Sequence, residues 1–408
     1  MNAVLDPSAR VVVTGLGVLT PIGETLKEFW DAAVRGVVGT RPLDRPDAAD
    51  FAGRLAGEVR GFAAPRGDGD RATRLAVAAA SAATSDAGLA PWTGDPSRAG
   101  VCFGTLLGNR AALEPAVTQF HRDAESGAGT QPARPRPVVG LADAVAREHG
   151  FLGPSSVVAT ACASGNSALA YAGEAIRAGR ADVMVAGGAD ELSTGIMMMF
   201  ASLRSLTDDA LRPFDRNRSG LVVSEGAAAL VLESYEHARR RGARVYAELA
   251  GWASACDAHH MTSPHPQGRG ARRSLERALA MSGVPLDRVG HISAHGTGTP
   301  SNDSVEAAAV RAVFGEHGPA VSSLKGALGH TQGAASAIEA VACVLALRDG
   351  VIPPTATLVD PDPDCAVDLV YGAAREAPLD VVVNNAFGFG GNTACTVFTR
   401  PRPGGNTG

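Results

Sequence analysis

Short apolar runs alternate with helical segments along almost the whole chain, and this alternation limits the possible folds more than any other feature. "RVVVTGLGVLTPIG" (10–23) is typical of a buried strand that ends in glycine turns, and "LKEFWDAAVRG" (26–36) of a helix stopped by glycine. Further strands are predicted at 100–105, 155–160, 182–189 and 226–234, helices at 70–88 and 166–178, and a loop at 125–137. Strands that are apolar throughout need helices on both faces of their sheet, so we expect an α/β layered fold.

A second series with the same rhythm begins near residue 245. It contains predicted strands at 245–254, 291–296, 320–324, 367–371 and 380–385, and predicted helices at 271–283, 303–314 and 333–348. The similar length of the two series indicates a duplication, although no repeat is visible residue by residue. The charged helix end "HARRRGAR" (237–244) predicts a boundary there, with domains at 1–243 and 244–408.

Composition and charge exclude several classes of protein. The chain has 408 residues, 45% hydrophobic and 19% charged, which is ordinary for a globular protein. A formal net charge of −5 argues against general nucleic-acid binding. The ends carry no signal-peptide pattern and no apolar run approaches a membrane span, so we expect a cytoplasmic protein without membrane contact. The six scattered cysteines form no CxxC pair, so neither a disulfide scaffold nor a structural metal is expected.

One cysteine occupies a position that suits a nucleophile. In "VVATACASGNSAL" (157–169), Cys162 lies where a strand gives way to a helix. Because a helix N-terminus favours an anion, we expect the pKa of this thiol to be lowered. Small residues follow it and leave room for a substrate. From this stretch alone, a buried structural cysteine is an equally good interpretation.

Two histidine motifs favour the catalytic interpretation. "SAHGTGTPSND" (293–303) and "SSLKGALGHTQGA" (322–334) each follow a predicted strand, and active sites of α/β proteins collect at the carboxyl ends of strands. They carry His295 in the first motif, and Lys325 and His330 in the second. A glycine-rich stretch, "NNAFGFGGNTA" (384–394), allows backbone N–H groups to approach a ligand.

Taken together, these motifs identify a family. "TACASG", "HGTGTP", "KGALGHTQGA" and "FGFGG" occur in the order and at the spacing typical of elongating, decarboxylating β-ketoacyl-acyl-carrier-protein synthases, and the chain resembles them over nearly its whole length. The resemblance implies a thiolase fold, in which two βαβαβ halves stack in five layers (αβαβα). It also implies an acyltransferase that condenses a malonyl thioester with a bound acyl chain. No cofactor is implied beyond the phosphopantetheine of an acyl carrier protein.

The resemblance also implies roles for the catalytic residues. Cys162 would hold the growing acyl chain as a thioester, and His295 and His330 would donate hydrogen bonds to the enolate formed on decarboxylation. Lys325 would pair with Glu306, and this pair would order the histidines.

Three further residues are assigned in the same way. The backbone N–H groups of Cys162 and Phe389 would form the oxyanion hole, and the Phe389 side chain would act as a gate for acyl chains. Thr297 and Thr299 would hydrogen-bond the pantetheine amides, although ordinary turn chemistry also explains these threonines.

The chain departs from the family pattern mainly around the expected acyl pocket. "TGIMMMFAS" (194–202) carries a run of methionines where relatives often have glycines, and "FGTLLGNR" (103–110) lacks a double glycine. We expect the acyl pocket to be lined by Leu107, Met197, Met198, Met199 and Phe200, with at least one methionine facing it. These departures favour specialised polyketide metabolism over housekeeping fatty-acid elongation.

The expected partners follow from the same resemblance. An acidic acyl carrier protein needs a basic docking surface, for which Arg71, Arg74 and Arg204 are candidates, although scattered solvated arginines would look the same. The resemblance implies a dimer, formed either with an identical chain or with a chain-length-factor-like subunit. A non-catalytic chain-length-factor-like role for this chain is disfavoured because the cysteine and both histidines are retained. A thiolase or a starter-condensing enzyme is disfavoured by the histidine pair.

Overall fold

The computed structural model describes residues 10–44, 51, 54–62, 71–110, 114–126 and 140–402. Five strands of the N-terminal half lie side by side in the order β5-β4-β6-β7-β1. They are β1 (Val11–Leu19), β4 (Ala99–Gly104), β5 (Ser155–Val158), β6 (Val183–Asp190) and β7 (Gly226–Ser234). β5, β4 and β6 pair in parallel, whereas β6, β7 and β1 pair in antiparallel fashion.

The C-terminal half repeats this arrangement strand for strand. Its order is β10-β9-β13-β14-β8, with β10, β9 and β13 parallel and β13, β14 and β8 antiparallel. The strands are β8 (Ala247–Cys256), β9 (Val289–Ser293), β10 (Ala320–Ser322), β13 (Val381–Phe387) and β14 (Asn392–Thr399). Short antiparallel pairing between β1 and β8 joins the two sheets. The duplication expected from the rhythm of the sequence is therefore confirmed by the topology.

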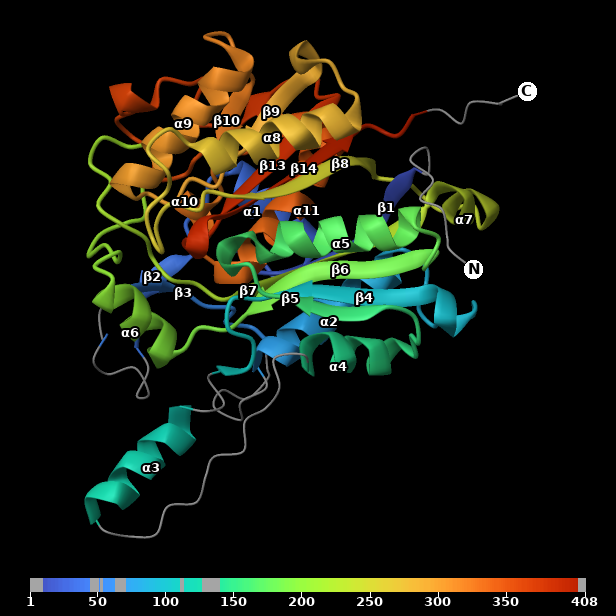
Figure 1. Ribbon diagram of the computed structural model, residues 1–408, viewed down its shortest axis with the longest axis horizontal. Helices are drawn as coiled ribbons and strands as arrows, with labels where there is room; N and C mark the ends of the chain where they lie inside the picture. The colour runs from blue at the N-terminus through green and yellow to red at the C-terminus, as the bar shows by residue number, and fades with distance from the viewer. Residues whose placement is uncertain are drawn as a thin grey trace.

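Helices form the other three layers (Figure 1). α5 (Ser164–Arg177) and α11 (Ala335–Asp349) lie between the two sheets, α2 (Arg71–Asp86) and α4 (Gly140–His149) cover the outer face of the N-terminal sheet, and α8 (Arg269–Ser282) and α9 (Pro300–Phe314) cover that of the C-terminal sheet. α11 is buried on all sides from Ala335 to Leu347, as its almost wholly apolar sequence requires. The predicted five-layer α/β fold is confirmed.

The remaining elements are short or peripheral. They are α1 (Leu26–Val34), α3 (Glu114–Ser126), α6 (Thr194–Ser202), α7 (Tyr235–Arg240), α10 (Lys325–Leu328), and the two-stranded sheets β2 (Thr40–Pro42) with β3 (Leu55–Gly57) and β11 (Val351–Ile352) with β12 (Arg375–Glu376). α3 projects from the body of the molecule (Figure 1). Most of the loop predicted at 125–137 lies outside the described residues.

The strand predicted at 367–371 does not form, because this segment makes only single bridges, such as Val321 with Leu369. The domain boundary at 243/244 falls between α7 and β8 and stays a prediction. Within the described ranges, no helix is both long and apolar enough to cross a bilayer, and no cluster of three or more side chains is suited to hold a metal ion.

Candidate active site

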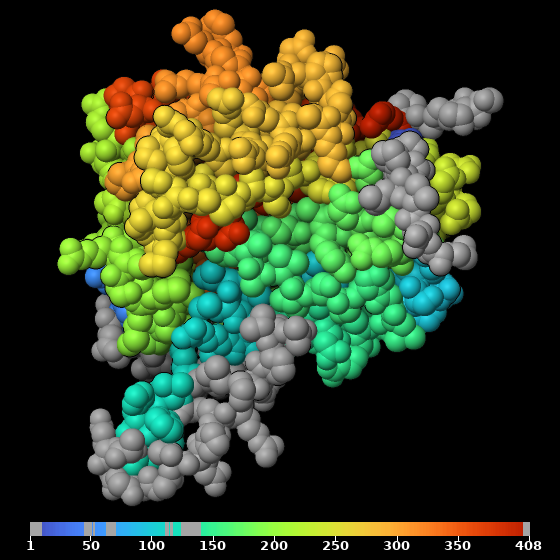
Figure 2. All heavy atoms as spheres, viewed as in Figure 1, coloured from blue at the N-terminus to red at the C-terminus, as the bar shows by residue number. Residues whose placement is uncertain are grey.

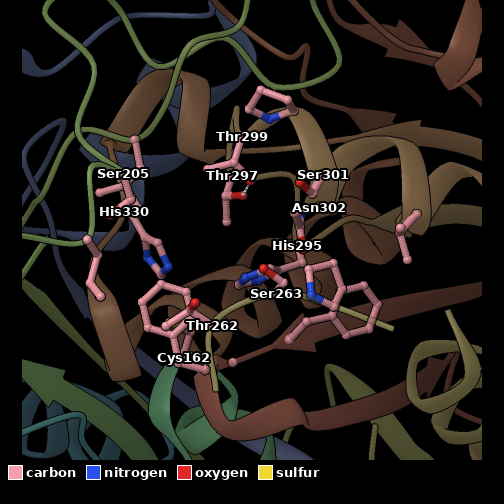
Figure 3. A pocket seen from close by; sticks show the side chains of 18 of the residues that line it. Cys162, Ser205, Thr262, Ser263, His295, Thr297, Thr299, Ser301, Asn302 and His330 are labelled. Atoms are coloured by element: carbon pink, nitrogen blue, oxygen red, sulfur yellow. Dashed lines mark hydrogen bonds between the residues drawn. The ribbon is translucent and has the colours of Figure 1, made fainter. Parts of the chain in front are cut away.

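A cavity of about 260 Å³ brings together residues from both halves of the chain. Cys162 comes from the N-terminal half, and His295, His330 and Phe389 from the C-terminal half. Figure 3 shows Cys162 at one end of the cavity, with the two imidazoles on opposite sides. Figure 2 shows the red C-terminal part of the chain reaching the surface between yellow and green residues, at the seam of the two halves.

Cys162 is presented by a strand–turn–helix connection. β5 ends at Val158, a single 3-10 turn spans Ala161–Ala163, and α5 begins at Ser164. Ala161 has a φ of 52°, in the left-handed region that costs energy for any residue with a Cβ. The Ser164 hydroxyl stabilises this turn, because it accepts a hydrogen bond from the Thr160 N–H at 2.9 Å. The turn places the cysteine at the N-terminal end of α5, as the sequence predicts.

The expected lowering of the thiol pKa is not what the structure shows. Burial raises the pKa of Cys162 to about 12, and the positive charge of Lys325 only partly opposes this. The thiol is 5% exposed, so water stabilises its thiolate poorly. The N-terminus of α5 favours the anion, but burial is the larger effect. In the resting protein Cys162 is therefore a neutral thiol.

Both histidines are neutral hydrogen-bond donors. Burial lowers the pKa of His295 and of His330 well below 6.5, and Lys325 lowers both further. The Gln332 N–H donates to Nδ1 of His330 at 3.1 Å, so the proton of this neutral ring lies on Nε2. The rings meet edge to face, with centroids 5.6 Å apart. A neutral pair of this kind can donate N–H groups to one oxygen without adding positive charge.

Two buried carboxylates of α9 hold the loop that carries His295. Glu306 accepts hydrogen bonds from the N–H groups of His295 and Gly296, both at 2.8 Å. Asp303 accepts from the N–H groups of Thr297 at 3.0 Å and Gly298 at 3.1 Å. Buried backbone donors need partners, and these carboxylates supply them. Glu306 therefore positions the loop, and burial raises its pKa to about 7.

The predicted pairing of Lys325 with Glu306 is wrong. The Lys325 ammonium donates to Oε1 of Glu339 at 2.5 Å, and each side chain is 1% exposed. Glu339 lies in the apolar helix α11, where a lone carboxylate would be costly without a cation. Burial raises its pKa to about 7, while Lys325 opposes that rise. The ion pair thus fixes a positive charge behind the cavity, where it acts on Cys162 and both histidines.

The glycine-rich loop after β13 approaches the cysteine closely. A Cβ on Gly388 would lie 3.0 Å from the Cys162 nitrogen and 2.9 Å from the Thr160 carbonyl oxygen, so glycine is needed there. Phe389 lines the cavity, with its ring centroid 6.0 Å from that of Phe200. This proximity agrees with an oxyanion hole formed by the N–H groups of Cys162 and Phe389, which stays a prediction, as does the gate.

Hydroxyl groups line the side of the cavity opposite the cysteine. Thr297 and Thr299 both lie there, with their Oγ1 atoms 2.9 Å apart (Figure 3). The structure adds residues that sequence reasoning missed: Thr262, Ser263, Ser301 and Asn302. They lie outside the four catalytic motifs or are unremarkable within them, so only the folded chain reveals them. Binding of pantetheine by these polar groups stays a prediction.

The residues expected to line the acyl pocket are only partly brought together. Phe200 lines the cavity and packs with the buried Met197 in one apolar cluster, against which Met199 and Leu107 also pack. Met198 is 50% exposed on the opposite side of α6, so its placement in the pocket is wrong for this chain. Leu107 lines a second, smaller cavity instead of the first.

The predicted docking arginines differ in their surroundings. The assignment of Arg71 to the docking surface is wrong, because this residue is 3% exposed. Its guanidinium binds both carboxylate oxygens of Glu225, at 3.0 and 2.7 Å. A buried, paired arginine has no surface to offer a partner. Arg204 is exposed and lines the cavity, and Arg74 is half-buried on α2. Docking at these two stays a prediction.

Comparison with known proteins shows similarity over nearly the whole chain. A family model described as the beta-ketoacyl synthase N-terminal domain matches residues 8–238, and the corresponding C-terminal model matches residues 246–359. A 3-oxoacyl-[acyl-carrier-protein] synthase 2 of Synechocystis sp. is 40% identical, over 96% of this chain and 98% of that protein. The tetracenomycin polyketide synthase ketoacyl synthase alpha subunit of Streptomyces glaucescens is also 40% identical, over 96% and 97%.

Solved structures agree with these matches. A chain of the ishigamide ketosynthase/chain length factor superimposes with a TM-score of 0.91 at 38% identity, covering 97% of this chain and 100% of that one. A chain from a complex of a type II polyketide acyl-carrier protein with its hexaketide-bound ketosynthase gives a TM-score of 0.89 at 33% identity, covering 96% and 100%. Sequence and fold thus give the same relatives.

Proposed function

Because the chain belongs to the β-ketoacyl synthase family, and is therefore an acyltransferase that forms carbon–carbon bonds, we propose that it is the catalytic ketosynthase subunit of a type II polyketide system. The observation that carries this proposal is the convergence of Cys162, His295 and His330 on one cavity. A non-catalytic subunit would have no need of that arrangement.

In the first half-reaction, Cys162 takes the acyl chain. Its sulfur attacks the carbonyl carbon of an acyl-carrier thioester, and the N–H groups of Cys162 and Phe389 stabilise the oxyanion. The bond from that carbon to the pantetheine sulfur breaks. The proton of the Cys162 thiol ends on the departing pantetheine thiol.

In the second half-reaction, a malonyl-carrier thioester loses CO₂. The electron pair of the broken carbon–carbon bond forms an enolate, whose oxygen accepts hydrogen bonds from Nε2–H of His330 and from the His295 ring. The enolate carbon attacks the acyl carbonyl, and the bond from that carbonyl to the Cys162 sulfur breaks. The carrier keeps the 3-oxoacyl product, and the Cys162 thiolate takes one proton from the solvent, a protonation that burial of the thiol favours.

The relatives support both a carrier and a subunit partner. Their descriptions include a ketosynthase in complex with an acyl-carrier protein and ketosynthases with chain length factors. We infer that this chain accepts its substrates from an acyl carrier protein and pairs with a chain-length-factor-like subunit, or with a second copy of itself. Phosphopantetheine on the carrier is the only prosthetic group the reaction needs. Action in the cytoplasm and the boundary at 243/244 stay predictions.

The polyketide assignment is tested by whether unreduced chains are elongated. The purified chain, alone and coexpressed with any homologous subunit encoded beside it, receives malonyl-carrier with either octanoyl- or 3-oxo-octanoyl-carrier, and no reductase. We expect the 3-oxo chain to be extended repeatedly, giving a ladder of products in mass spectrometry, and Cys162→Ala to give none. A single extension confined to the saturated chain would instead identify a housekeeping fatty-acid synthase.

A further inference from the structure

A second cavity, of about 10 Å³, lies apart from the main one and has a carboxyl group in its wall. Its lining includes Leu107, Ile196, Gln332 and the adjacent acids Asp190 and Glu191. Its volume is about that of one water-sized sphere. The exposed Arg110 also borders it. None of the four catalytic motifs includes Glu191.

Glu191 and Asp190 are both buried, but their hydrogen bonding differs. Asp190 accepts hydrogen bonds from the Thr105 hydroxyl at 2.6 Å and from the N–H of Gly333 at 2.7 Å, so it has a structural role. Glu191 is 8% exposed, and its Oε1 is buried with no hydrogen-bond partner among the described residues. An unpaired buried polar atom costs free energy, so an unpaired carboxyl oxygen on a residue that lines a cavity points to a ligand.

The surroundings of Glu191 keep its carboxyl group protonated. Burial raises its pKa to about 8, and the nearby Glu225, Asp190 and Glu114 add to this rise. Arg71 opposes this rise, but its effect is the smallest of these. A protonated carboxyl group can donate one hydrogen bond, which a carboxylate cannot do. It can therefore bind a neutral oxygen in apolar surroundings.

One apolar cluster of side chains borders both cavities. Ile196 lines the second cavity, while Phe200, one turn further along α6, lines the first. Both belong to the apolar cluster against which Leu107 and Phe389 pack. Likewise Gln332 borders the second cavity and His330 the first. An acyl chain on Cys162 that reached Glu191 would have to run along this cluster.

We propose that Glu191 recognises oxygen on the growing acyl chain, donating its proton to a keto or hydroxyl oxygen far from the thioester and so selecting oxygenated chains. This proposal rests on the function proposed above, because it requires acyl chains on Cys162. A purely apolar pocket would give an oxygenated chain no partner and would favour a saturated one. Glu191 is thus a residue that determines specificity and takes no part in bond formation.

The test measures acylation of Cys162 by a matched set of pantetheine thioesters. The set contains octanoyl-pantetheine and analogues in which one oxo group moves carbon by carbon towards the far end. The wild-type protein is compared with Glu191→Leu, which removes the hydrogen-bond donor of the side chain. It is also compared with Glu191→Gln, whose amide group still donates hydrogen bonds. Glu114→Gln is the matched control, since that acid lies near Glu191 but its Oε1 already accepts from the N–H of Gly195.

We expect wild type to prefer one oxo position over octanoyl by about 2–10-fold, the worth of one neutral hydrogen bond. Glu191→Leu should lose that preference and acylate at least as well with octanoyl, while Glu191→Gln and Glu114→Gln should keep it. A preference that persists in Glu191→Leu, or a uniform loss of rate for every chain, would overturn the proposal for Glu191 alone. Failure of wild type to acylate Cys162 with any member would overturn the proposed function as well.

Discussion

The Lys325–Glu339 ion pair lies close enough to the site to act on it electrostatically, although neither residue lines the cavity. Its positive charge lowers the pKa of Cys162, His295 and His330 relative to what burial alone would give. Both partners are buried, so neither is screened by water. We therefore expect the pair to affect activity through the charge of Lys325 and stability through the pairing of two buried charges, and substitution can separate the two effects.

Lys325→Met should cost about 3–5 kcal/mol in the free energy of unfolding, because it leaves Glu339 buried without a cation. The double variant Lys325→Met/Glu339→Leu should recover most of that loss, since apolar residues often replace a buried pair without penalty. Both variants should react more slowly with iodoacetamide at Cys162, because the charge that favours the thiolate is gone. Urea unfolding and the alkylation rate measure the two effects. Recovery of stability together with a normal alkylation rate would show that Lys325 has no electrostatic role.

The sequence predicts these residues better than it predicts their contacts. Four short motifs are enough to select Cys162, His295 and His330, because each depends on residue type next to a strand end. The partner of Lys325 depends instead on how α11 packs between the sheets, which no local pattern encodes. The thiol pKa was mispredicted for a similar reason, since the helix N-terminus is local and the depth of burial is not.

At the scale of single elements, the geometry of helix α6 gives three consecutive methionines different surroundings. Successive residues of a helix point in different directions, so Met197, Met198 and Met199 cannot share one face. Met197 is 1% exposed and packs in the apolar cluster with Phe200, whereas Met198 is 50% exposed. That at least one methionine faces the acyl pocket stays a prediction, and the helix phase makes the buried Met197 the candidate.

Met197→Ala should lengthen the products, because it removes bulk from the cluster next to Phe200, and Met197→Phe should shorten them. The alanine variant should also lose about 2–5 kcal/mol of stability, as expected for a large-to-small change in a core. Met198→Ala is the matched control and should alter neither quantity, given its exposure. Carrier-bound products are compared by mass spectrometry, with any partner subunit present. Equal product lengths for Met197→Ala, Met197→Phe and wild type would place the pocket elsewhere.

At the scale of the whole molecule, duplication explains why the site lies where it does. The same strand order and the same pairing directions occur in both halves, and α5 and α11 meet between the sheets. Cys162 comes from one half and the two histidines from the other, so the cavity exists only when the halves are stacked (Figure 1). The rhythm of the sequence indicated the duplication, whereas the stacking of the halves was expected only from the resemblance to a known family. The segment at 367–371 was mispredicted because an apolar run alone does not decide whether a neighbouring strand is available.

The central claim is that each half of the molecule supplies a different part of the reaction. Cys162 of the N-terminal half holds the acyl chain, and His295 and His330 of the C-terminal half promote decarboxylation of the malonyl group. The most direct measurement is made on His330→Ala, incubated with acyl-carrier and malonyl-carrier. CO₂ release and the mass of the tryptic peptide containing Cys162 are followed together. The account predicts acylation of Cys162 near the wild-type rate, with CO₂ release reduced by about 10²–10³-fold, so that the acyl peptide accumulates. Unchanged CO₂ release, or an acyl group on any other residue, would contradict it.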